Sequence, residues 1–276
     1  MIYLYGQISP LSDTPVLDTQ VLLAHILGKP RAWVLAHPET LLGKNQHASL
    51  SQAVTRLRGG EPLPYVLGKW EFFGLTFQVT PAVLIPRPET ELVVEKALDW
   101  LNAHPNRGRV VDVGTGSGCI AVSLARQSPD LRIVATDISF LALKVARSNA
   151  ILHGLSQQID FLQSDLLSGL KAGLNGQFDV ICANPPYLPT SRLGSLKVYQ
   201  SEPTLALDGG EDGLSIIRRL LTQSVQLLTP GGILLSEIDV TLSESVRLIA
   251  HSAFPGATIQ IIRDLSGNDR LLAISS

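Results

Sequence analysis

From about residue 109 onward, segments with the pattern of β-strands alternate with segments with the pattern of α-helices. Short apolar runs predict strands at residues 109–113, 132–136, 159–162, 179–183, 232–237, 258–262 and 270–273. Helical periodicity predicts helices near residues 120–127, 140–153, 214–228 and 241–251. This alternation is typical of an α/β domain, here with a mostly parallel seven-stranded sheet and helices on both faces. Because only Arg263 to Asp269 separates the last two strands, too little for a helical crossover, we expect the last strand to be antiparallel.

The chain before this α/β region divides into two further parts. Residues 1–60 have the pattern of a small helical bundle, in which Asp13-Thr14-Pro15 starts the first helix and Gly59-Gly60 ends the last. Partner docking and simple stabilisation are both consistent with such a bundle. Residues 61–90 are punctuated by Pro and Gly and predict a linker of short β-like pieces that includes a hairpin. We therefore expect a helical docking domain at 1–60, a linker at 61–90 and the α/β domain at 91–276.

A glycine-rich loop follows the first predicted strand of the α/β domain. Its glycines are Gly114, Gly116 and Gly118, with Thr115 and Ser117 between them. Glycine lets the backbone approach a ligand closely, and the helix that follows offers free N–H groups at its start. The third glycine is misplaced for a dinucleotide fingerprint, no Lys-Ser/Thr follows as in a P-loop, and no cation is present to meet a pyrophosphate. The loop therefore favours a cofactor that lacks phosphate.

Acidic residues follow the next two predicted strands. Asp137 lies about twenty residues beyond the loop, where a carboxylate accepts hydrogen bonds from two ribose hydroxyls. Asp165 is placed to face an adenine edge, with Leu166 packing on the base. Each aspartate taken alone could equally be a helix cap. Since open α/β sheets bind ligands at the carboxyl ends of their strands, the loop and the two aspartates predict one shared nucleoside site.

The fourth predicted strand ends in Asn184-Pro185-Pro186-Tyr187. Two successive prolines end a strand abruptly, because each fixes its own φ and lacks a backbone N–H, and Pro185 pushes Asn184 into an extended conformation. The resulting strand end is rich in acceptors and poor in donors, which suits a planar NH2 group. A proline-rich turn without function is the simpler alternative for the tetrapeptide by itself.

Composition and charge disfavour several other classes of protein. The net charge of −2 and the absence of any Lys- or Arg-rich block argue against tight binding to a nucleic-acid duplex. Cys119 and Cys182 have no metal-ligand spacing and are expected to be buried, reduced thiols, so we predict no metal. No signal peptide is evident, and the apolar stretches are far shorter than a membrane span. We expect a cytoplasmic monomer that binds neither membrane nor nucleic acid directly.

Several of these stretches resemble known proteins. Asn-Pro-Pro-Tyr at a strand end is similar to the catalytic motif of methyltransferases that alkylate an amino or amide nitrogen with S-adenosylmethionine. The run Ile-Pro-Arg-Pro-Glu-Thr-Glu at residues 85–91 is far more specific. With residues 64–68, 73–75, 202–214 and 263–267, it resembles the HemK/PrmC family of peptide chain release factor glutamine methyltransferases. Two departures are Ala183, where Ser or Thr is usual, and Asp239, where glycine is expected.

The resemblance implies a Rossmann-like class I methyltransferase domain that uses S-adenosyl-L-methionine. Its implied substrate is the glutamine of the Gly-Gly-Gln motif in class I peptide chain release factors. On this reading Asn184, Pro185 and Tyr187 are catalytic, and the same residues bind substrate together with Pro186 and Arg87. Tyr187 is expected to wall the pocket beside the cationic methyl group. The glycine loop, the two acidic strand ends and the leucine after the second are expected to bind the cofactor, together with Asn184.

Three alternatives remain open at the level of sequence. The first is the sister activity on a glutamine of a ribosomal protein. The second is methylation of the amino group of adenine or guanine in nucleic acid, which could use the same four residues. The third is a cofactor-binding scaffold without catalysis.

Overall fold

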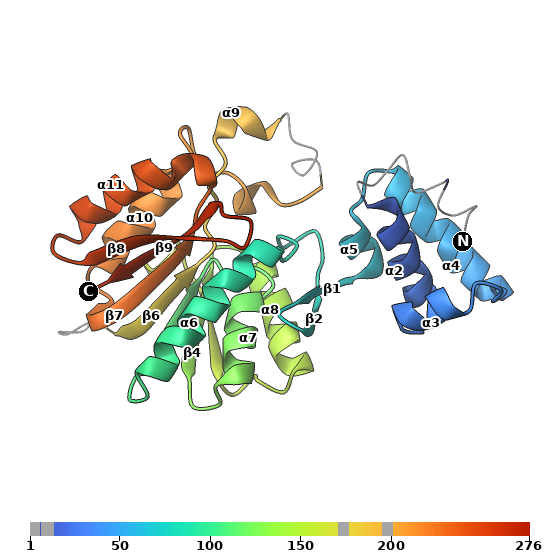
Figure 1. Cartoon of the computed structure of the whole chain (residues 1–276), viewed down its shortest axis with the longest axis horizontal. Helices are drawn as coiled ribbons and strands as arrows, with labels where there is room; N and C mark the ends of the chain where they lie inside the picture. Colours follow the sequence, from blue (N-terminus) through green and yellow to red (C-terminus); the bar gives the residue numbers. More distant parts are fainter. Residues whose placement is uncertain (1–5, 7–13, 171–176, 195–200) are drawn as a thin grey trace. The chain divides into compact units, whose positions relative to one another are not determined.

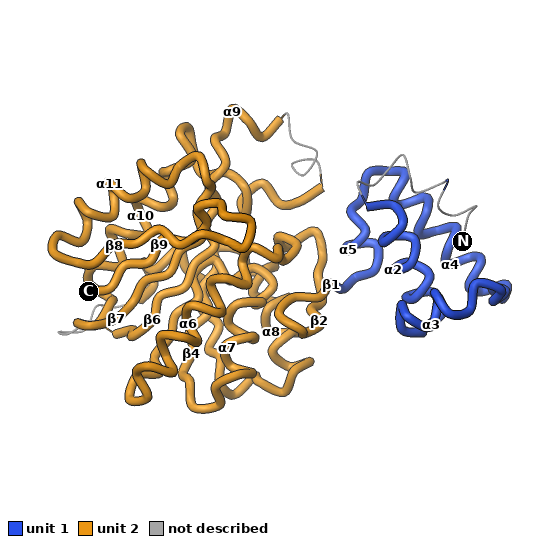
Figure 2. The backbone as a smooth tube through the Cα atoms, viewed as in Figure 1, with its two compact units in different colours: residues 1–69 blue, residues 70–276 orange. Residues whose placement is uncertain are grey.

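The structure, a computed structural model, describes residue 6 and residues 14–170, 177–194 and 201–276. The chain forms two compact units, residues 1–69 and residues 70–276, drawn in blue and orange in Figure 2. The division between them falls inside the segment 61–90 that the sequence predicts as a linker.

The first unit is helical in its described part. Its helices are α2 (Pro15–Leu27), α3 (Arg31–Ala36), α4 (Lys44–Arg58) and α5 (Leu63–Leu67). Helix α2 begins at Pro15 and α4 ends at Arg58, just before Gly59-Gly60, as the sequence predicts. Their inward faces bury Leu22, Val34 and Val54, so the unit has a small hydrophobic core of its own.

Helix α5 corrects the sequence analysis, which predicts only short β-like pieces after Gly60. Pro64 stands in the first turn, where its missing N–H costs nothing, and Gly68 ends the helix with a left-handed φ of 68°. Arg56 on α4 donates to the carbonyls of Tyr65 and Val66 at 3.0 and 3.1 Å. A contact from another helix thus supports a five-residue element that is too short to show periodicity in the sequence.

The predicted hairpin is present and precedes the large sheet of the second unit in the chain. Strands β1 (Lys69–Phe72) and β2 (Leu75–Gln78) pair with each other as a two-stranded sheet. Phe73 and Gly74 both have positive φ, 49° and 70°, as a tight two-residue hairpin turn requires. The N–H of Phe73 donates to Glu91 at 2.7 Å, and Phe72 and Phe77 are almost completely buried, which fixes the hairpin to the α/β domain.

A seven-stranded sheet forms the centre of the second unit (Figure 1). Its strand order is β5-β4-β3-β6-β7-β9-β8. The strands are β3 (Arg109–Val113), β4 (Arg132–Asp137), β5 (Ile159–Gln163), β6 (Phe178–Ala183), β7 (Leu228–Glu237), β8 (Thr258–Arg263) and β9 (Asp269–Ser275). Neighbours in the series from β5 to β7 are parallel, whereas β9 lies between β7 and β8 and is antiparallel to both. The mostly parallel sheet with an antiparallel last strand is therefore confirmed.

Helices cover both faces of this sheet because side chains alternate along each strand. Val110 and Val180 point to the face covered by α6 (Glu91–Ala103) and α7 (Cys119–Gln127). Val111 and Ile181, their neighbours in sequence, point to the face covered by α10 (Ser215–Ser224) and α11 (Ser243–Ala253). Helix α8 (Phe140–Leu152) joins β4 to β5 and contacts both strands and α7. Both faces of β3 and β6 are thus buried, which explains their continuous apolar sequences.

Helix α10 is shorter, and strand β7 longer, than the sequence predicts. The helix ends at Ser224 instead of near Leu228, and the strand begins at Leu228 instead of Gly232. Leu228 is paired with Phe178, and the N–H of Phe178 donates to Leu227 at 2.9 Å. Leu228, which the apolar periodicity places at the end of a helix, is therefore part of a strand because it pairs with β6.

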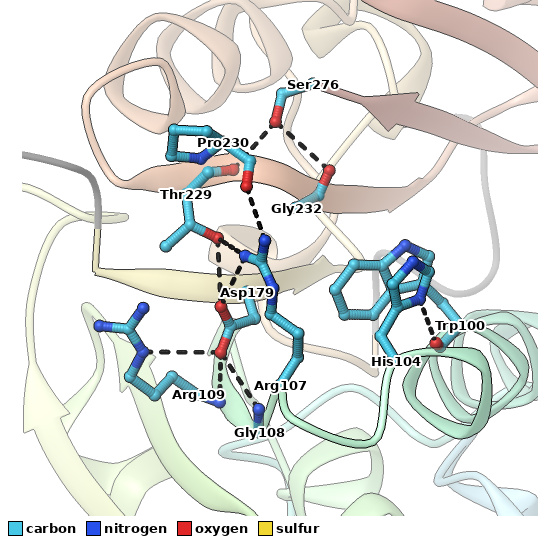
Figure 3. A network of polar contacts seen from close by, with 10 residues as sticks. All are labelled: Trp100, His104, Arg107, Gly108, Arg109, Asp179, Thr229, Pro230, Gly232 and Ser276. Carbon is cyan, nitrogen blue, oxygen red and sulfur yellow. Dashed lines mark hydrogen bonds and ion pairs between the residues drawn. The ribbon is translucent and has the colours of Figure 1, made fainter.

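A polar network closes the amino end of the sheet (Figure 3). Asp179, the second residue of β6, is 3% exposed and accepts from the backbone N–H groups of Gly108 and Arg109 at 3.1 and 3.0 Å. The guanidinium of Arg107 lies 3.1 Å from the other oxygen of Asp179 and donates to Thr229 at 2.7 Å. The network links β3, β6 and β7 at the end of the sheet opposite Asn184.

Within the described ranges, no helix combines the length and apolarity needed to cross a membrane. Among the same residues, no three His, Cys, Asp or Glu side chains are grouped as metal ligands would be.

Candidate active site

A cavity of about 390 Å³ lies at the carboxyl ends of β3, β4, β5 and β6. Its walls come from the four segments that follow these strands and from three others, which are residues 82–90, residues 203–208 and helix α10. This is the edge at which the strand order reverses, because the chain runs outward from β3 to β5 and returns to place β6 on the other side of β3. Open α/β sheets bind their ligands at such a point.

The glycine loop forms one wall of the cavity through residues 114–117. Asp112 on β3 is hydrogen-bonded to the loop and to the helix that follows it. Its Oδ2 accepts from the hydroxyl of Thr115 at 2.6 Å and from the N–H of Ala121 at 3.2 Å. Burial raises the pKa of Asp112 to about 6, although these two hydrogen bonds oppose the rise. The loop is therefore fixed by a buried carboxyl group before any ligand binds.

Gly118, the last glycine of the loop, does not line the cavity. It begins α7 with a φ of 80°, and a Cβ atom there would lie 3.1 Å from the Cβ of Ala146 on α8. The third glycine thus permits close packing of α7 against α8.

Asp137 reaches the cavity from the end of β4. One of its oxygens accepts from Gly116 N at 2.9 Å and the other from Ser139 N at 2.8 Å. Burial raises the pKa of Asp137, and these two backbone bonds oppose that effect. Each carboxylate oxygen keeps a second acceptor position, so a pair of neighbouring hydroxyls on a ligand fits this side chain.

Asp165 and Leu166 line the cavity beyond β5. Leu166 has a φ of 54°, a left-handed conformation that is uncommon for a side chain other than Gly, Asn or Asp. The Asp165 carboxylate pairs with Arg219 of α10, and Arg219 also lines the cavity. Sequence analysis missed Arg219, since nothing in the local pattern of α10 separates it from Arg218.

Asn184 and Pro186 line the cavity next to β6, whereas Pro185 and Tyr187 do not. Tyr187, which the sequence analysis expects to wall the pocket, thus lies outside the lining of this cavity. Its ring packs among the apolar side chains between the sheet, α10 and α11, and its hydroxyl donates to Glu237 at 3.2 Å. Burial, together with the adjacent charge of Glu237, raises the pKa of Tyr187, so the phenol remains a neutral donor.

The side-chain nitrogen of Asn184 is engaged by a neighbouring hydroxyl. Nδ2 donates to Thr90 Oγ1 at 3.0 Å, and the Thr90 hydroxyl donates to Glu237 Oε2 at 2.6 Å. Thr90 and Glu237 are 2% and 1% exposed. Their part in the site was missed because they stand 147 positions apart and meet only in the folded chain.

Segments 82–90 and 203–208 face the strand ends from the other side of the cavity. Glu202, 6% exposed, joins them: it pairs with Arg87 and accepts from the N–H of Ile85 at 2.9 Å. Arg87 lines the cavity and keeps about a third of its side chain exposed. The arginine predicted to bind substrate is thus held at the cavity wall by a carboxylate that the sequence analysis did not single out.

The backbone of the tetrapeptide is packed tightly under a glycine-rich turn. A Cβ atom at Gly209 would lie 2.8 Å from the Cα of Tyr187, and one at Gly213 would lie 2.5 Å from the carbonyl oxygen of Tyr187. Leu188 is bonded on both sides to this turn, by its N–H to Leu207 and by its carbonyl to Gly209. Main-chain packing therefore holds the end of the tetrapeptide in place.

Two family models match the chain, one in each unit. The PrmC N-terminal domain matches residues 9–68, and the Methyltransferase small domain matches residues 91–198.

Solved structures of other methyltransferases share the fold at low sequence identity. A T. thermophilus 16S rRNA methyltransferase in complex with AdoMet and guanosine is 19% identical, with a TM-score of 0.55 over 75% of this chain and 49% of that one. The N-terminal domain of human METTL16 in complex with SAH is 20% identical, with a TM-score of 0.52 over 86% of this chain and 84% of that one. These likenesses establish a methyltransferase fold.

Curated relatives are considerably closer in sequence. The release factor glutamine methyltransferase of Moorella thermoacetica is 43% identical over 94% of this chain and 90% of its own length. That of Koribacter versatilis is 40% identical over 95% of this chain and 91% of its own length. The chain belongs to the family of release factor glutamine methyltransferases.

Proposed function

We propose that this protein transfers a methyl group from S-adenosyl-L-methionine to the side-chain nitrogen of the glutamine in the Gly-Gly-Gln motif of class I peptide chain release factors. Membership of the family supports the substrate. The carrying observation is the position of Asn184, whose amide nitrogen is held by Thr90 while the side chain lines the same cavity as Asp137.

The cavity fits S-adenosylmethionine in shape and in chemistry. Its volume is within the range of sites for small ligands. The spare acceptor positions of Asp137 suit the two ribose hydroxyls, and Leu166 offers an apolar surface for the base. When bound, S-adenosylmethionine supplies an electrophilic methyl group on a positively charged sulfur. The loop at residues 114–117 carries no cation, in keeping with a ligand that has no phosphate.

Asn184 would bind the amide that is to be methylated. A carboxamide nitrogen is a poor nucleophile, because its lone pair is delocalised into the carbonyl. Oδ1 of Asn184, which lines the cavity, would accept a hydrogen bond from its NH2 group and stabilise the positive charge that develops on the nitrogen. Preorganised groups of this kind are typically worth about 3–4 kcal/mol each. Holding the nitrogen in line for attack contributes roughly 7–11 kcal/mol more in favourable cases.

The proposal also covers the protein partner, the cellular compartment and the oligomeric state. Release factor is the proposed protein partner, and a role for the helical unit in docking it is part of the proposal. Cys119 and Cys182 are both buried and unpaired with each other, in keeping with a cytoplasmic enzyme. We expect the enzyme to act as a monomer, which light scattering of the purified protein tests.

A labelling experiment tests the proposed substrate. Enzyme and S-adenosylmethionine labelled on its methyl group are incubated separately with release factor, with ribosomal protein and with nucleic acid. Label on release factor alone, located by mass spectrometry on the glutamine of Gly-Gly-Gln, is the expected result. Label confined to nucleic acid, or to ribosomal protein, would assign the enzyme to one of the two rival substrates instead.

A further inference from the structure

A continuous chain of hydrogen bonds links Asn184 to a buried carboxylate. Asn184 Nδ2 donates to Thr90 Oγ1 at 3.0 Å, Thr90 Oγ1 donates to Glu237 Oε2 at 2.6 Å, and the hydroxyl of Tyr187 donates to Glu237 Oε1 at 3.2 Å. Strand register brings these groups together. Ala183 on β6 is paired with Ser236 on β7, so the next residues along the two parallel strands, Asn184 and Glu237, lie side by side.

The chemistry of the carboxylate fixes the direction of this chain. An ionised carboxylate only accepts hydrogen bonds, and a threonine hydroxyl has a single proton to donate. When that proton is given to Glu237, Thr90 Oγ1 can only accept from Asn184. The Asn184 side chain must then turn its NH2 group toward Thr90 and its oxygen toward the cavity. The opposite orientation of the amide would require the Thr90 proton, and Glu237 would lose its closest donor.

We propose that Glu237 is a positioning residue that, through Thr90, turns the acceptor oxygen of Asn184 toward the substrate amide. This inference rests on the proposed role of Asn184 and deepens it. Glu237 never touches the substrate, because it is 1% exposed and lies behind Thr90, outside the cavity lining. Its task requires the ionised form. A protonated Glu237 can donate to Thr90, and the Thr90 proton is then free to turn to Asn184 and invert the amide.

The groups around Glu237 shift its pKa in both directions, and the net shift is upward. Burial raises the pKa of Glu237, and the charge of Glu89 just before α6 adds to the rise. The hydrogen bonds from Thr90 and Tyr187 and the charge of Arg270 on β9 oppose it. Two further titratable groups, Cys119 on α7 and Asp239 after β7, interact with Glu237 and Tyr187 respectively. A raised pKa places the loss of the active orientation above the pH at which an exposed glutamate protonates.

Glu237→Gln is the central test, because glutamine keeps the shape but can donate to Thr90. With release factor as substrate, we expect kcat to fall about 100-fold, the size of effect seen when one preorganised polar contact is lost. The dissociation constant for S-adenosylmethionine and the KM for release factor should change less than about threefold. Thr90→Val should reproduce the loss, whereas Thr90→Ser, which keeps the hydroxyl, should restore most of the rate.

Asp179→Asn is a matched control for the loss of a buried carboxylate. Asp179 and Glu237 lie on adjacent parallel strands, Asp179 near the start of β6 and Glu237 at the end of β7, and so at opposite ends of the sheet. This variant should be less stable, with kcat per folded molecule unchanged. If Glu237→Gln folds poorly, the pH profile of the wild type serves as the test instead. As the pH is lowered and Glu237 takes up a proton, kcat should decline in the wild type and remain flat, at a low level, in Thr90→Val.

The outcomes separate this inference from the proposed function. Full kcat in Glu237→Gln, equal losses in Thr90→Ser and Thr90→Val, or parallel pH profiles of wild type and Thr90→Val would each overturn the positioning role. Asn184→Ala is assayed alongside. If that variant is inactive while Glu237→Gln is fully active, only the inference fails; if Asn184→Ala is fully active, the proposed mechanism fails as well.

Discussion

At the scale of single residues, the proposed roles assign cofactor binding and catalysis to different side chains. Asp137 lies at the end of β4 and offers two oxygens to a ligand, whereas Asn184 lies beyond β6 and offers one. Both side chains are oriented by neighbours that hold their other polar positions, the backbone at Gly116 and Ser139 for the aspartate and Thr90 for the asparagine. Substitution of Asp137 should therefore weaken cofactor binding with little effect on turnover, and substitution of Asn184 should do the reverse.

Asn184→Ala removes the proposed acceptor for the substrate amide without touching the loop or Asp137. We expect kcat to fall about 10²- to 10³-fold, the usual consequence of losing one preorganised contact in the transition state. Stopped assays of release factor methylation measure the rate, and calorimetry measures the affinity for S-adenosylmethionine, which should change less than about threefold.

Asp137→Ala is the reciprocal control for this pair of measurements. Hydrogen bonds to a charged group are worth about 1.5–3 kcal/mol, so affinity for the cofactor should drop roughly 10- to 100-fold. Tight cofactor binding in Asp137→Ala, or unchanged turnover in Asn184→Ala, contradicts the assignment of the two residues.

Residues next to strand ends could be predicted from the sequence, and residues that meet them from elsewhere could not. Asp137, Asp165 and Asn184 each follow an apolar run, so their common edge follows from the parallel sheet alone. Thr90 and Glu237 reach Asn184 only in the folded chain. The register of β6 with β7 brings Glu237 beside Asn184, and the start of α6 brings Thr90 there. No spacing rule connects positions that lie 147 residues apart.

At the scale of elements, the turn at residues 209–213 limits where the tetrapeptide can lie. Gly213 has a φ of 75°, and a Cβ atom there would approach the Tyr187 carbonyl to 2.5 Å. Neither that carbonyl nor the turn can move without disturbing the hydrogen bonds on Leu188. The glycine-rich turn thus helps to fix the position of Asn184, although about 25 residues separate the two in the sequence.

Gly213→Ala should therefore displace the tetrapeptide as well as destabilise the protein. Overpacking of this kind typically costs about 1–3 kcal/mol, and a shift of Asn184 should lower kcat by at least tenfold. Thermal unfolding and methylation assays measure the two effects. Gly154→Ala is the control: its φ of 73° imposes the same backbone strain, but nothing lies within 4 Å of the added Cβ. Equal loss of kcat in the two variants would show that the contact with Tyr187 is irrelevant.

Element types were predictable from the sequence wherever the pattern was long. The strand–helix alternation after residue 109 gave the strands and helices of the α/β domain and their mostly parallel order. Errors occurred where tertiary contacts outweighed local pattern. Arg56 supports α5 from another helix, and pairing with Phe178 converts Leu228 from the end of a predicted helix into the start of β7.

At the scale of the whole molecule, the amino end of the sheet contributes to stability and the carboxyl end to function. Burial alone would raise the pKa of Asp179, but the N–H groups of Arg109 and Gly108 and the guanidinium of Arg107 lower it to about 2. Because the folded-state pKa lies below the ordinary value of 3.8, the charge stabilises the fold above pH 3.8. This stabilisation is lost as the pH falls toward 2.

Asp179→Asn should consequently cost on the order of 2 kcal/mol at pH 7, with the difference from wild type shrinking below pH 3.8. Urea denaturation at neutral and acid pH, followed by circular dichroism, measures it. A difference that stays constant down to pH 2 would mean that the packing of Asp179, and not its charge, is what the variant removes.

On the proposed function, the helical unit docks the whole substrate and residues 70–276 carry out the chemistry on its reactive loop. The proposed acceptors, the glycine loop and the Arg87–Glu202 pair all belong to residues 70–276. A short peptide that contains Gly-Gly-Gln should therefore need only that unit, whereas folded release factor has further surface for the helical unit to contact.

A chain that begins at Lys69 lacks all four described helices of the first unit and keeps the hairpin intact. We expect its kcat/KM for folded release factor to fall at least tenfold, about 1.4 kcal/mol, with kcat/KM for the peptide changed less than threefold. Equal losses on both substrates would make the helical unit a stabilising element of the enzyme and remove it from substrate docking.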